Sequence, residues 1–278
     1  MKKISRRSFM AAAAVSVAAL ALTACGGSAS SAASSVASSA ASSEAVSSAA
    51  AADLTTVEAG KLTMATNAAF PPYEMTTDSG EFEGIDIETA QAIADKLGLE
   101  LQIDDMDFDA ALLSVQQGKA DIVMAGVTVT DERKAVMDFS DSYATGIQSI
   151  IVPNDSDIAS PDDLAGKKIG TQRGTTGYIY CSDDFGDENV VAYDDGLTAV
   201  QALNNGQVDA VVIDNAPAQE FVAANPGLKV LDTSYAEEDY AIGMAKGSAL
   251  EDAVNKALEE LKADGTLQAI VDKYINAN

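Results

Sequence analysis

The sequence predicts an α/β protein made of two similar lobes with a ligand cleft between them. Short apolar runs alternate along the chain with segments of helical periodicity, and several of these runs are continuous. Continuous apolar runs are typical of strands that helices cover on both faces, so we expect largely parallel sheets. Residues 117–121 (QGKAD) recur as residues 205–209 (NGQVD), and each unit ends a helix and leads into a buried strand. This repeat indicates two lobes of similar construction.

Nine strands and five helices are expected along this pattern. The apolar runs predict strands at 61–66, 99–103, 121–125, 148–152, 167–171, 189–193, 209–213, 228–231 and 240–245. Apolar stripes predict helices at 87–97, around 112–115, from 198 to about 205, at 250–261 and at 267–274. Three of these helices are followed by a glycine that can end them, at Gly98, Gly118 and Gly206.

The first 24 residues are expected to be a lipoprotein signal peptide. A basic start precedes an apolar run over 9–22, which is shorter than the ~20 residues of a membrane-spanning helix. Leu22-Thr23-Ala24-Cys25 resembles a bacterial lipobox, which predicts lipidation of Cys25. The double arginine at 6–7 also fits a twin-arginine signal, so general secretion and twin-arginine export both stay open.

Residues 25–52 are read as the lipidated cysteine and a flexible tether. From 26 to 52 the chain is almost entirely Ser and Ala and has no aromatic residue, so it has too little apolar bulk to build a core. The remaining residues, 53–278, suffice for one large domain or two closely packed lobes.

The composition excludes several classes of function. The chain carries 17 Lys and Arg against 43 Asp and Glu, a formal charge of −26, so it would repel nucleic acid. It has no histidine, which removes the usual general base, the Ser-His-Asp triad and histidine metal sites. With Cys25 lipidated, Cys181 is alone and is read as a small helical residue. We expect no enzyme activity, no metal and no cofactor.

Arg133 is the first candidate for ligand binding. It follows a buried strand and a Gly-Thr turn in AGVTVTDER, residues 125–133, and a guanidinium can bind both oxygens of a carboxylate. The simpler alternative for one arginine is a surface or structural ion pair.

Other candidates also follow strands, where the ligands of open parallel sheets bind. Phe70 and Phe108 could form flat walls, or belong to the core. The glycine-rich turn containing Thr175 and Thr176 lacks the lysine of a phosphate loop, but it resembles a helix start that can bind a carboxylate. Asp214 could pair with an ammonium group or cap the next segment.

A calcium site at the acids 105, 107 and 109 is rejected. Ala110 stands where the calcium loop needs glycine, and Gln116 stands where it needs glutamate.

Six motifs in order carry a family resemblance from about Leu62 to Tyr274. They are TNAAFPPYE, GIDIETAQAIADKLG, AGVTVTDER with DFSDSY, GTTG, DAVVID and ALEELKADGTLQAIVDKY. Together they resemble the polar amino-acid-binding proteins of bacterial ABC importers, solute-binding protein family 3. The resemblance implies two Rossmann-like α/β lobes joined by a hinge of two crossovers, with lobe 1 at 53–146 and 241–278 and lobe 2 at 147–240.

The resemblance also implies which residues bind the ligand. The set is Asn67, Phe70, Phe108, Ala125, Gly126, Thr128, Arg133, Gln172, Thr175, Thr176 and Asp214. In this set Arg133 binds the carboxylate with backbone N–H groups near Thr128 and Thr176. Asp214 binds the α-ammonium with the Gly126 carbonyl and the Thr128 hydroxyl.

The side chain of the ligand is expected between Phe70 and Phe108, with Asn67 and Gln172 at its far end. Many members of the family have aspartate where this chain has Asn67, so a strongly cationic ligand is disfavoured. No lysine lies at the matched positions, which disfavours an acidic ligand. Neutral polar amino acids, basic ones and cystine all stay open.

The expected function is therefore an extracytoplasmic, lipid-anchored receptor that delivers a polar L-amino acid to an ABC permease. We expect a monomer that contacts the membrane through its lipid anchor only. One alternative is a periplasmic dehydratase acting on prephenate-like acids, as in cyclohexadienyl dehydratase, which would have no need of an ammonium partner such as Asp214. The other is an amino-acid sensor, which usually carries a transmembrane helix and signalling domain, and the sequence has none after Asn278.

Overall fold

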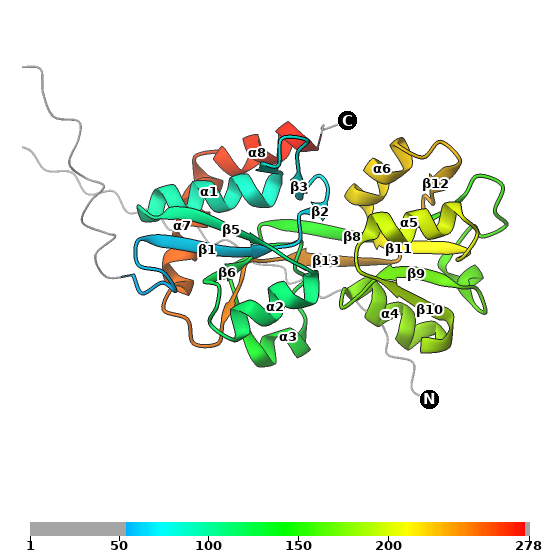
Figure 1. Ribbon diagram of the computed structural model, residues 1–278, viewed down its shortest axis with the longest axis horizontal. Coiled ribbons are helices and arrows are strands. Elements are labelled where there is room, and N and C mark those ends of the chain that lie inside the picture. The colour runs from blue at the N-terminus through cyan, green and yellow to red at the C-terminus, as the bar shows by residue number, and fades with distance from the viewer. Residues whose placement is uncertain (1–53, 276–278) are drawn as a thin grey trace, which may run out of the picture. The chain divides into compact units, whose positions relative to one another are not determined.

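The computed structural model describes residues 54–275, and Figure 1 shows their arrangement as helices around two central sheets. The predicted α/β class is confirmed. The signal peptide, Cys25 and the tether lie outside the described residues. Within 54–275, no helix combines the length and apolar character that a membrane crossing requires.

The first sheet has five strands in the order β5-β1-β6-β14-β7. These are β1 (Lys61–Thr66), β5 (Glu100–Asp105), β6 (Ile122–Val123), β7 (Met137–Phe139) and β14 (Gly243–Ala245). Its helices are α1 (Ile85–Leu97), α2 (Phe108–Gln116), α3 (Asp131–Val136), α7 (Glu251–Ala263) and α8 (Thr266–Tyr274). Figure 1 shows α1 and α8 over one face of this sheet and α2 with α3 over the other.

The second sheet has the order β10-β9-β11-β8-β12, and β13 also pairs with β8. Its strands are β8 (Ala144–Pro153), β9 (Ile169–Gln172), β10 (Val190–Tyr193), β11 (Ala210–Asp214), β12 (Leu228–Val230) and β13 (Ala236–Tyr240). Its helices are α4 (Thr176–Phe185), α5 (Gly196–Asn204) and α6 (Asn215–Ala223). In Figure 1, α5 and α6 lie on the face opposite α4.

A small third sheet carries aromatic and acidic residues of the site. It contains β2 (Ala69–Phe70), β3 (Glu74–Thr76) and β4 (Phe82–Glu83) in that order.

The expectation of largely parallel sheets is wrong, because both sheets are mixed. β1 pairs in parallel with β5 and β6, and β9 pairs in parallel with β10 and β11. β14 runs antiparallel to β6 and β7, and β8 runs antiparallel to β11, β12 and β13. The antiparallel strands come just before or after the chain changes sheet, where it must reverse direction.

The chain passes between the two sheets twice. It leaves the first sheet after β7 and enters the second through β8, and it returns from β13 to β14. The run predicted as one strand at 240–245 is therefore two strands, interrupted at Ala241 and Ile242 where the chain changes sheet. β8 and β13 form an antiparallel pair, and Figure 1 shows them running side by side between the two sheets. The two-crossover hinge is confirmed, whereas the exact lobe boundaries stay a prediction.

Three of the observed helices were not predicted as such. α3 has only six residues, α4 was recognised only as a helix start, and α6 carries Pro217 in its first turn. Proline is tolerated there because the first backbone N–H groups of a helix have no partner within it.

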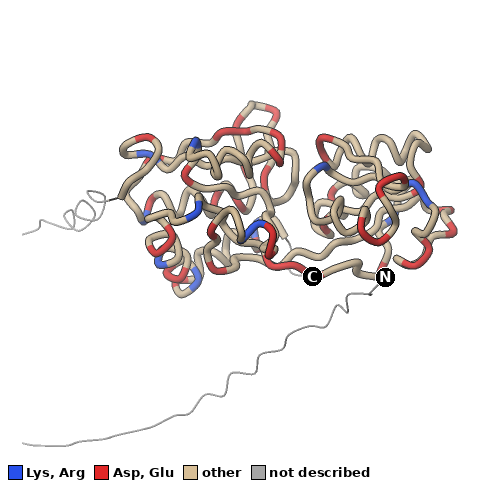
Figure 2. Tube along the Cα trace, turned by 90° about the horizontal axis from the view of Figure 1, so that it is seen from below, with Lys and Arg blue, Asp and Glu red and all other residues tan. Residues whose placement is uncertain are grey.

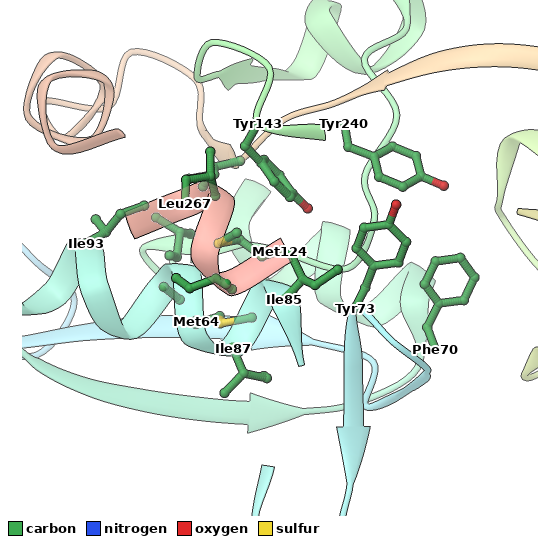
Figure 3. Packing of buried hydrophobic residues seen from close by; sticks show 14 of the residues in the cluster. Met64, Phe70, Tyr73, Ile85, Ile87, Ile93, Met124, Tyr143, Tyr240 and Leu267 are labelled. Carbon is green, nitrogen blue, oxygen red and sulfur yellow. The ribbon is translucent and has the colours of Figure 1, made fainter. Parts of the chain in front are cut away.

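The apolar core around the first sheet extends to the pocket. Met64, Ile93, Met124 and Leu267 are buried between the first sheet and its helices. Figure 3 shows this apolar packing running toward a group of aromatic side chains that includes Tyr73, Tyr143 and Tyr240. The tyrosine hydroxyls therefore stand at the border between core and site.

Candidate functional site

One pocket lies between the two sheets, close to the carboxyl ends of β1, β6, β9 and β11. Its lining contains all eleven residues of the predicted ligand-binding set, namely Asn67, Phe70, Phe108, Ala125, Gly126, Thr128, Arg133, Gln172, Thr175, Thr176 and Asp214. It also contains four residues that the sequence did not single out, Glu74, Gln148, Ile213 and Tyr240. The structure thus brings the predicted set together, although their roles in binding stay a prediction.

Arg133 is held in the pocket by the short helix α3. The Thr130 side chain caps this helix by accepting a hydrogen bond from the Arg133 backbone N–H at 3.2 Å. The guanidinium donates to the Thr128 carbonyl at 2.8 Å through Nη1 and to the Gly174 carbonyl at 3.1 Å through Nη2. Its central carbon lies 5.4 Å from the centre of the Phe108 ring. These contacts, from its own segment and from Gly174, fix the direction of the side chain.

No carboxylate neutralises Arg133 at close range. The residue is 9% exposed, and none of the ion pairs found within residues 54–275 includes it. Burial lowers the pKa of the guanidinium, and the charge of Glu238 partly opposes this effect. The ion-pair alternative does not hold here, and a buried cation with unused N–H groups is suited to bind an anion.

Asp214 stands at the end of β11, where the chain enters α6. Its Oδ1 accepts the Ala216 N–H at 3.1 Å, and its Oδ2 accepts the Ile147 N–H at 2.7 Å. Asp214 therefore caps α6, as the second interpretation predicted, and its side chain also lines the pocket. Burial raises the pKa of Asp214 to about 6, opposed by a hydrogen bond from the Tyr240 hydroxyl and by the two backbone N–H groups. A nearby cation would restore the ionised form.

Aromatic rings line the same pocket. Phe70 and Tyr73 are stacked with ring centres 5.8 Å apart, and Tyr73 meets Tyr240 edge to face at 5.4 Å (Figure 3). Phe108 is 5% exposed and belongs to the core, so the core interpretation of this residue is confirmed, whereas its role as a wall for the ligand stays a prediction.

Gly126 allows the backbone to pass close to these rings. A Cβ at this position would come within 2.9 Å of the Phe70 ring, and its φ of +55° lies in the left-handed region. A larger residue would therefore push the ring into the pocket.

The far end of the pocket is closed by two amides, one from each side. Gln172 Nε2 donates to Asn67 Oδ1 at 2.8 Å, and Asn67 Nδ2 donates to the Met106 carbonyl at 3.0 Å. This end of the pocket is polar and uncharged.

Helix α4 begins at the pocket. The Thr175 side chain caps the helix by accepting the Tyr178 N–H at 3.3 Å. The Thr176 hydroxyl lies 3.4 Å from the Thr128 hydroxyl of the opposite side. The first N–H groups of a helix have no partners within it, so this end is suited to bind a negative group.

A buried pair of acids behind the pocket was not predicted. Glu74 is fully buried, and its pKa is raised well above the usual range by burial and by the neighbouring Asp86. Asp86 accepts the Gly126 N–H at 3.0 Å and the Tyr143 hydroxyl at 2.8 Å, while burial raises its pKa to about 6. Two adjacent buried carboxyl groups do not both ionise readily, and the raised pKa of Glu74 disfavours its charged form.

The pocket differs in charge from the molecule around it. Figure 2 shows Asp and Glu spread over the surface with few Lys or Arg. Among the lining residues Arg133 is the one cation, and the acids are Asp214 and Glu74. Two α/β units that enclose such a polar pocket, and that are joined by paired strands, have the architecture of a solute-binding protein.

The comparisons with known proteins agree with this class. Residues 62–277 match the family model of bacterial extracellular solute-binding proteins, family 3, and the chain belongs to that family. It is 34% identical over 225 residues to the L-cystine-binding protein TcyJ of Escherichia coli strain K12, which covers 80% of this chain and 85% of that protein.

Solved structures share the fold closely. The arginine-, lysine-, histidine-binding protein ArtJ of Geobacillus stearothermophilus superposes with a TM-score of 0.75 at 34% identity, over 78% of this chain and 96% of that one. An ancestral arginine-binding protein solved with bound glutamine gives a TM-score of 0.74 at 42% identity, over 78% and 98% of the two chains. The neighbours have the type II periplasmic-binding-protein fold.

Proposed function

We propose that this protein binds one free polar amino acid in the pocket and delivers it unchanged to an ABC transporter permease. The observation that carries the proposal is the position of two opposite charges. Arg133 enters the pocket from α3, which packs on the first sheet, and Asp214 enters from the end of β11 in the second sheet. No ion pair joins the two side chains within residues 54–275. An amino acid has a carboxylate and an ammonium group attached to the same α-carbon, so it can bind Arg133 and Asp214 at once.

The proposed orientation follows from the contacts around each charge. The carboxylate binds to Arg133 and to the N-terminus of α4 at Thr176. The ammonium binds to Asp214 and to the Thr128 hydroxyl. The side chain then extends between Phe70 and Phe108 toward the amides of Asn67 and Gln172.

Binding and closure are coupled in this proposal. The two predicted lobes meet through contacts at the pocket, such as Gln172 with Asn67 and Arg133 with the Gly174 carbonyl. A ligand that satisfies charges on both sides favours the closed state over an open one. Conversion from mostly open to mostly closed requires about 5 kcal/mol of preference. Two charge-assisted contacts of about 1.5–3 kcal/mol each are of this size.

The charge of the lining favours a neutral polar side chain. Arg133 and Asp214 balance each other, and the far end carries amides. Burial beside Asp86 raises the pKa of Glu74, which disfavours its charged form. A cationic side chain would need Glu74 or another group to ionise. The relatives nevertheless include proteins named for arginine, lysine, histidine and cystine binding, so these ligands belong in the test.

The cellular setting is also part of the proposal. Membership of an extracellular solute-binding family supports an extracytoplasmic place beside a permease. The lipobox at Cys25 supports attachment through a lipid, with residues 26–52 as the tether. The protein is proposed to act as a monomer.

A thermal melting screen tests the proposal. The panel is L-glutamine, L-arginine, L-lysine, L-histidine and L-cystine, with the other common amino acids. A ligand at about 100 times its Kd adds about 2.7 kcal/mol of stability, or a rise of roughly 5–11 °C in Tm. Mass spectrometry of the released ligand should show it chemically unchanged. The absence of any shift across the panel, or conversion of the ligand, would refute the proposal.

A further inference from the structure

Glu238 is a buried carboxylate next to the pocket that does not line it. It lies on β13, one of the two strands that join the sheets, and is 6% exposed. Its Oε2 accepts hydrogen bonds from the Thr128 hydroxyl and from Gln148 Nε2, both at 3.0 Å. Its Oε1 is buried and has no hydrogen-bond partner within the described part of the chain. Burying a carboxylate in this way costs free energy, because one of its oxygens has lost its water without gaining a partner.

The strand directs Glu238 inward and its neighbours outward. Glu237 and Asp239 are exposed, whereas Glu238 and Tyr240 are buried. Glu238 stands opposite Gly146 of β8 in the antiparallel pair. Glu238 is therefore fixed by both connecting strands and reaches the pocket only through the side chains of Thr128 and Gln148.

This contact determines what the Thr128 hydroxyl can offer to a ligand. A hydroxyl has one proton to donate and two lone pairs. Thr128 donates its proton to Glu238, and its backbone carbonyl accepts a hydrogen bond from Arg133 at 2.8 Å. One lone pair of the hydroxyl can accept the proton of the Thr176 hydroxyl, which lies 3.4 Å away, so the other lone pair is what the hydroxyl offers to the pocket. Such an oxygen attracts a protonated amine and repels a carboxylate.

We infer that Glu238 is a positioning residue that fixes the Thr128 hydroxyl as an acceptor and thereby selects ligands with an ammonium group beside the carboxylate bound by Arg133. The inference rests on the proposed function, because it concerns the same pocket and assumes an amino-acid ligand. It adds a specificity determinant on the connecting strand, outside the lining itself.

The test compares each amino acid with an analogue that lacks only the ammonium group. The probes are L-arginine with guanidinovalerate and L-glutamine with glutaramate, measured by calorimetry on the whole protein. The quantity of interest is the Kd of the analogue divided by the Kd of the amino acid. Effects of a variant on the carboxylate or on the side chain of the ligand are common to both members of a pair and cancel in this ratio.

Two substitutions at Glu238 separate its charge from its role as an acceptor. Glu238→Leu removes both, and we expect the ratio to fall about tenfold or more, the effect of one hydrogen bond to a charged group. Glu238→Gln removes the charge but keeps an acceptor oxygen, so the ratio should stay within about threefold of wild type. Glu237→Leu, on the exposed side of the same strand, is the matched control and should leave the ratio unchanged.

A double-mutant cycle with Thr128→Val shows whether Glu238 acts through the hydroxyl. Thr128→Val alone should lower the ratio as Glu238→Leu does, and adding Glu238→Leu should then lower it no further. The inference would be overturned if Glu238→Leu folds and keeps the wild-type ratio. It would also be overturned if Glu238→Leu lowers the ratio by the same factor in wild type and in Thr128→Val. If Glu238→Leu does not fold, an unchanged ratio in Thr128→Val would overturn it as well. Failure of the proposed function is distinct, because wild type would then bind no amino acid.

Discussion

The two halves of the fold are alike at the start of a central strand and different at its end. The unit at 117–121 and the unit at 205–209 each follow a helix, α2 and α5. Their glycines, Gly118 and Gly206, have φ of +65° and +68°. The residue after each glycine donates its backbone N–H to a carbonyl of the preceding helix at 2.9 Å, Lys119 to Ser114 and Gln207 to Ala202. The repeated sequence therefore produces the same turn twice.

The aspartates that close these units also have matching roles. Asp121 accepts the Thr63 N–H at 2.8 Å, and Asp209 accepts the Lys168 N–H at 2.8 Å. Each carboxylate ties the beginning of its own strand to a neighbouring segment. Both units lie at the end of the strand away from the pocket, so they serve the fold.

At the other end of the strands the chemistry diverges. β6 leads to Gly126, Thr128 and Arg133, which present a cation, whereas β11 ends in Asp214, an anion. The comparison teaches that the similar construction of the halves lies in the turns that precede the strands. A ligand with two opposite charges then requires the halves to differ where they face each other.

The largest effect should come from Arg133→Ala. The variant loses a guanidinium that can make two charge-assisted hydrogen bonds of about 1.5–3 kcal/mol each, so we expect affinity for the amino acid to fall at least about a hundredfold. Arg133→Lys should recover only part of this, because an ammonium cannot bind both oxygens in one plane. Calorimetric titration gives both values.

Arg173→Ala is the matched control for this loss. Arg173 follows a strand of the second sheet but is exposed, and it pairs at 3.4 Å with Asp194, whose side chain is 74% exposed. Exposed pairs contribute about 0–1 kcal/mol, so affinity should change less than threefold. Similar losses in the two variants would contradict the role given to Arg133.

Asp214→Asn should weaken binding by about ten- to a hundredfold, the effect of one charge-assisted hydrogen bond. Asparagine remains a good cap for α6, so the melting temperature of the ligand-free protein should not fall. Asp209→Asn should do the reverse, lowering stability by about 1 kcal/mol and leaving affinity alone. Unchanged affinity in Asp214→Asn would mean that the two strand ends do not share one ligand.

Much of this division could be predicted from the sequence. Residues 117–121 and 205–209 are visibly similar, and turn residues act locally. Arg133, Phe70 and Asp214 could be predicted because each lies in the segment that follows a predicted strand, and strand ends meet at one edge of a sheet.

The residues that were missed depend on contacts between distant segments. Gln148, Tyr240 and Glu238 lie on β8 and β13, and the pairing of Gln148 with Ala236 joins positions far apart in the chain. Glu74 has an ordinary acidic sequence context, and its raised pKa follows from burial and from the neighbouring Asp86. No local pattern reports either effect.

The strand ends should also differ in pH dependence. Burial raises the pKa of Asp214 to about 6 in the ligand-free protein, and a bound ammonium lowers it again. Below about pH 6 the carboxyl must lose a proton on binding, so affinity should fall up to tenfold per pH unit. Titrations from pH 7 to pH 4.5 measure this slope, and Asp214→Asn should make it shallower.

The same shift affects stability with a definite sign. A carboxyl whose pKa is raised on folding binds more protons in the folded than in the unfolded state between its two pKa values. Its contribution therefore destabilises the ligand-free protein as pH rises from about 4 to about 6. Relative to wild type, Asp214→Asn should gain stability over this interval. If Asp214→Asn instead lost stability relative to wild type as pH rises over this interval, burial would not raise the pKa of Asp214.

The smallest effects test whether the two turns are equivalent. No heavy atom lies within 4 Å of a Cβ added at Gly118 or Gly206, so alanine there meets only the cost of a left-handed backbone. This cost is about 1–2 kcal/mol, and chemical denaturation should give the same value for both variants within error, with unchanged ligand affinity. Gly126→Ala shares the positive φ but also contacts the Phe70 ring, so it alone should weaken binding. A loss of affinity in Gly118→Ala or Gly206→Ala would mean that the turns before the strands influence the site, contrary to the separation seen between the two ends of the strands.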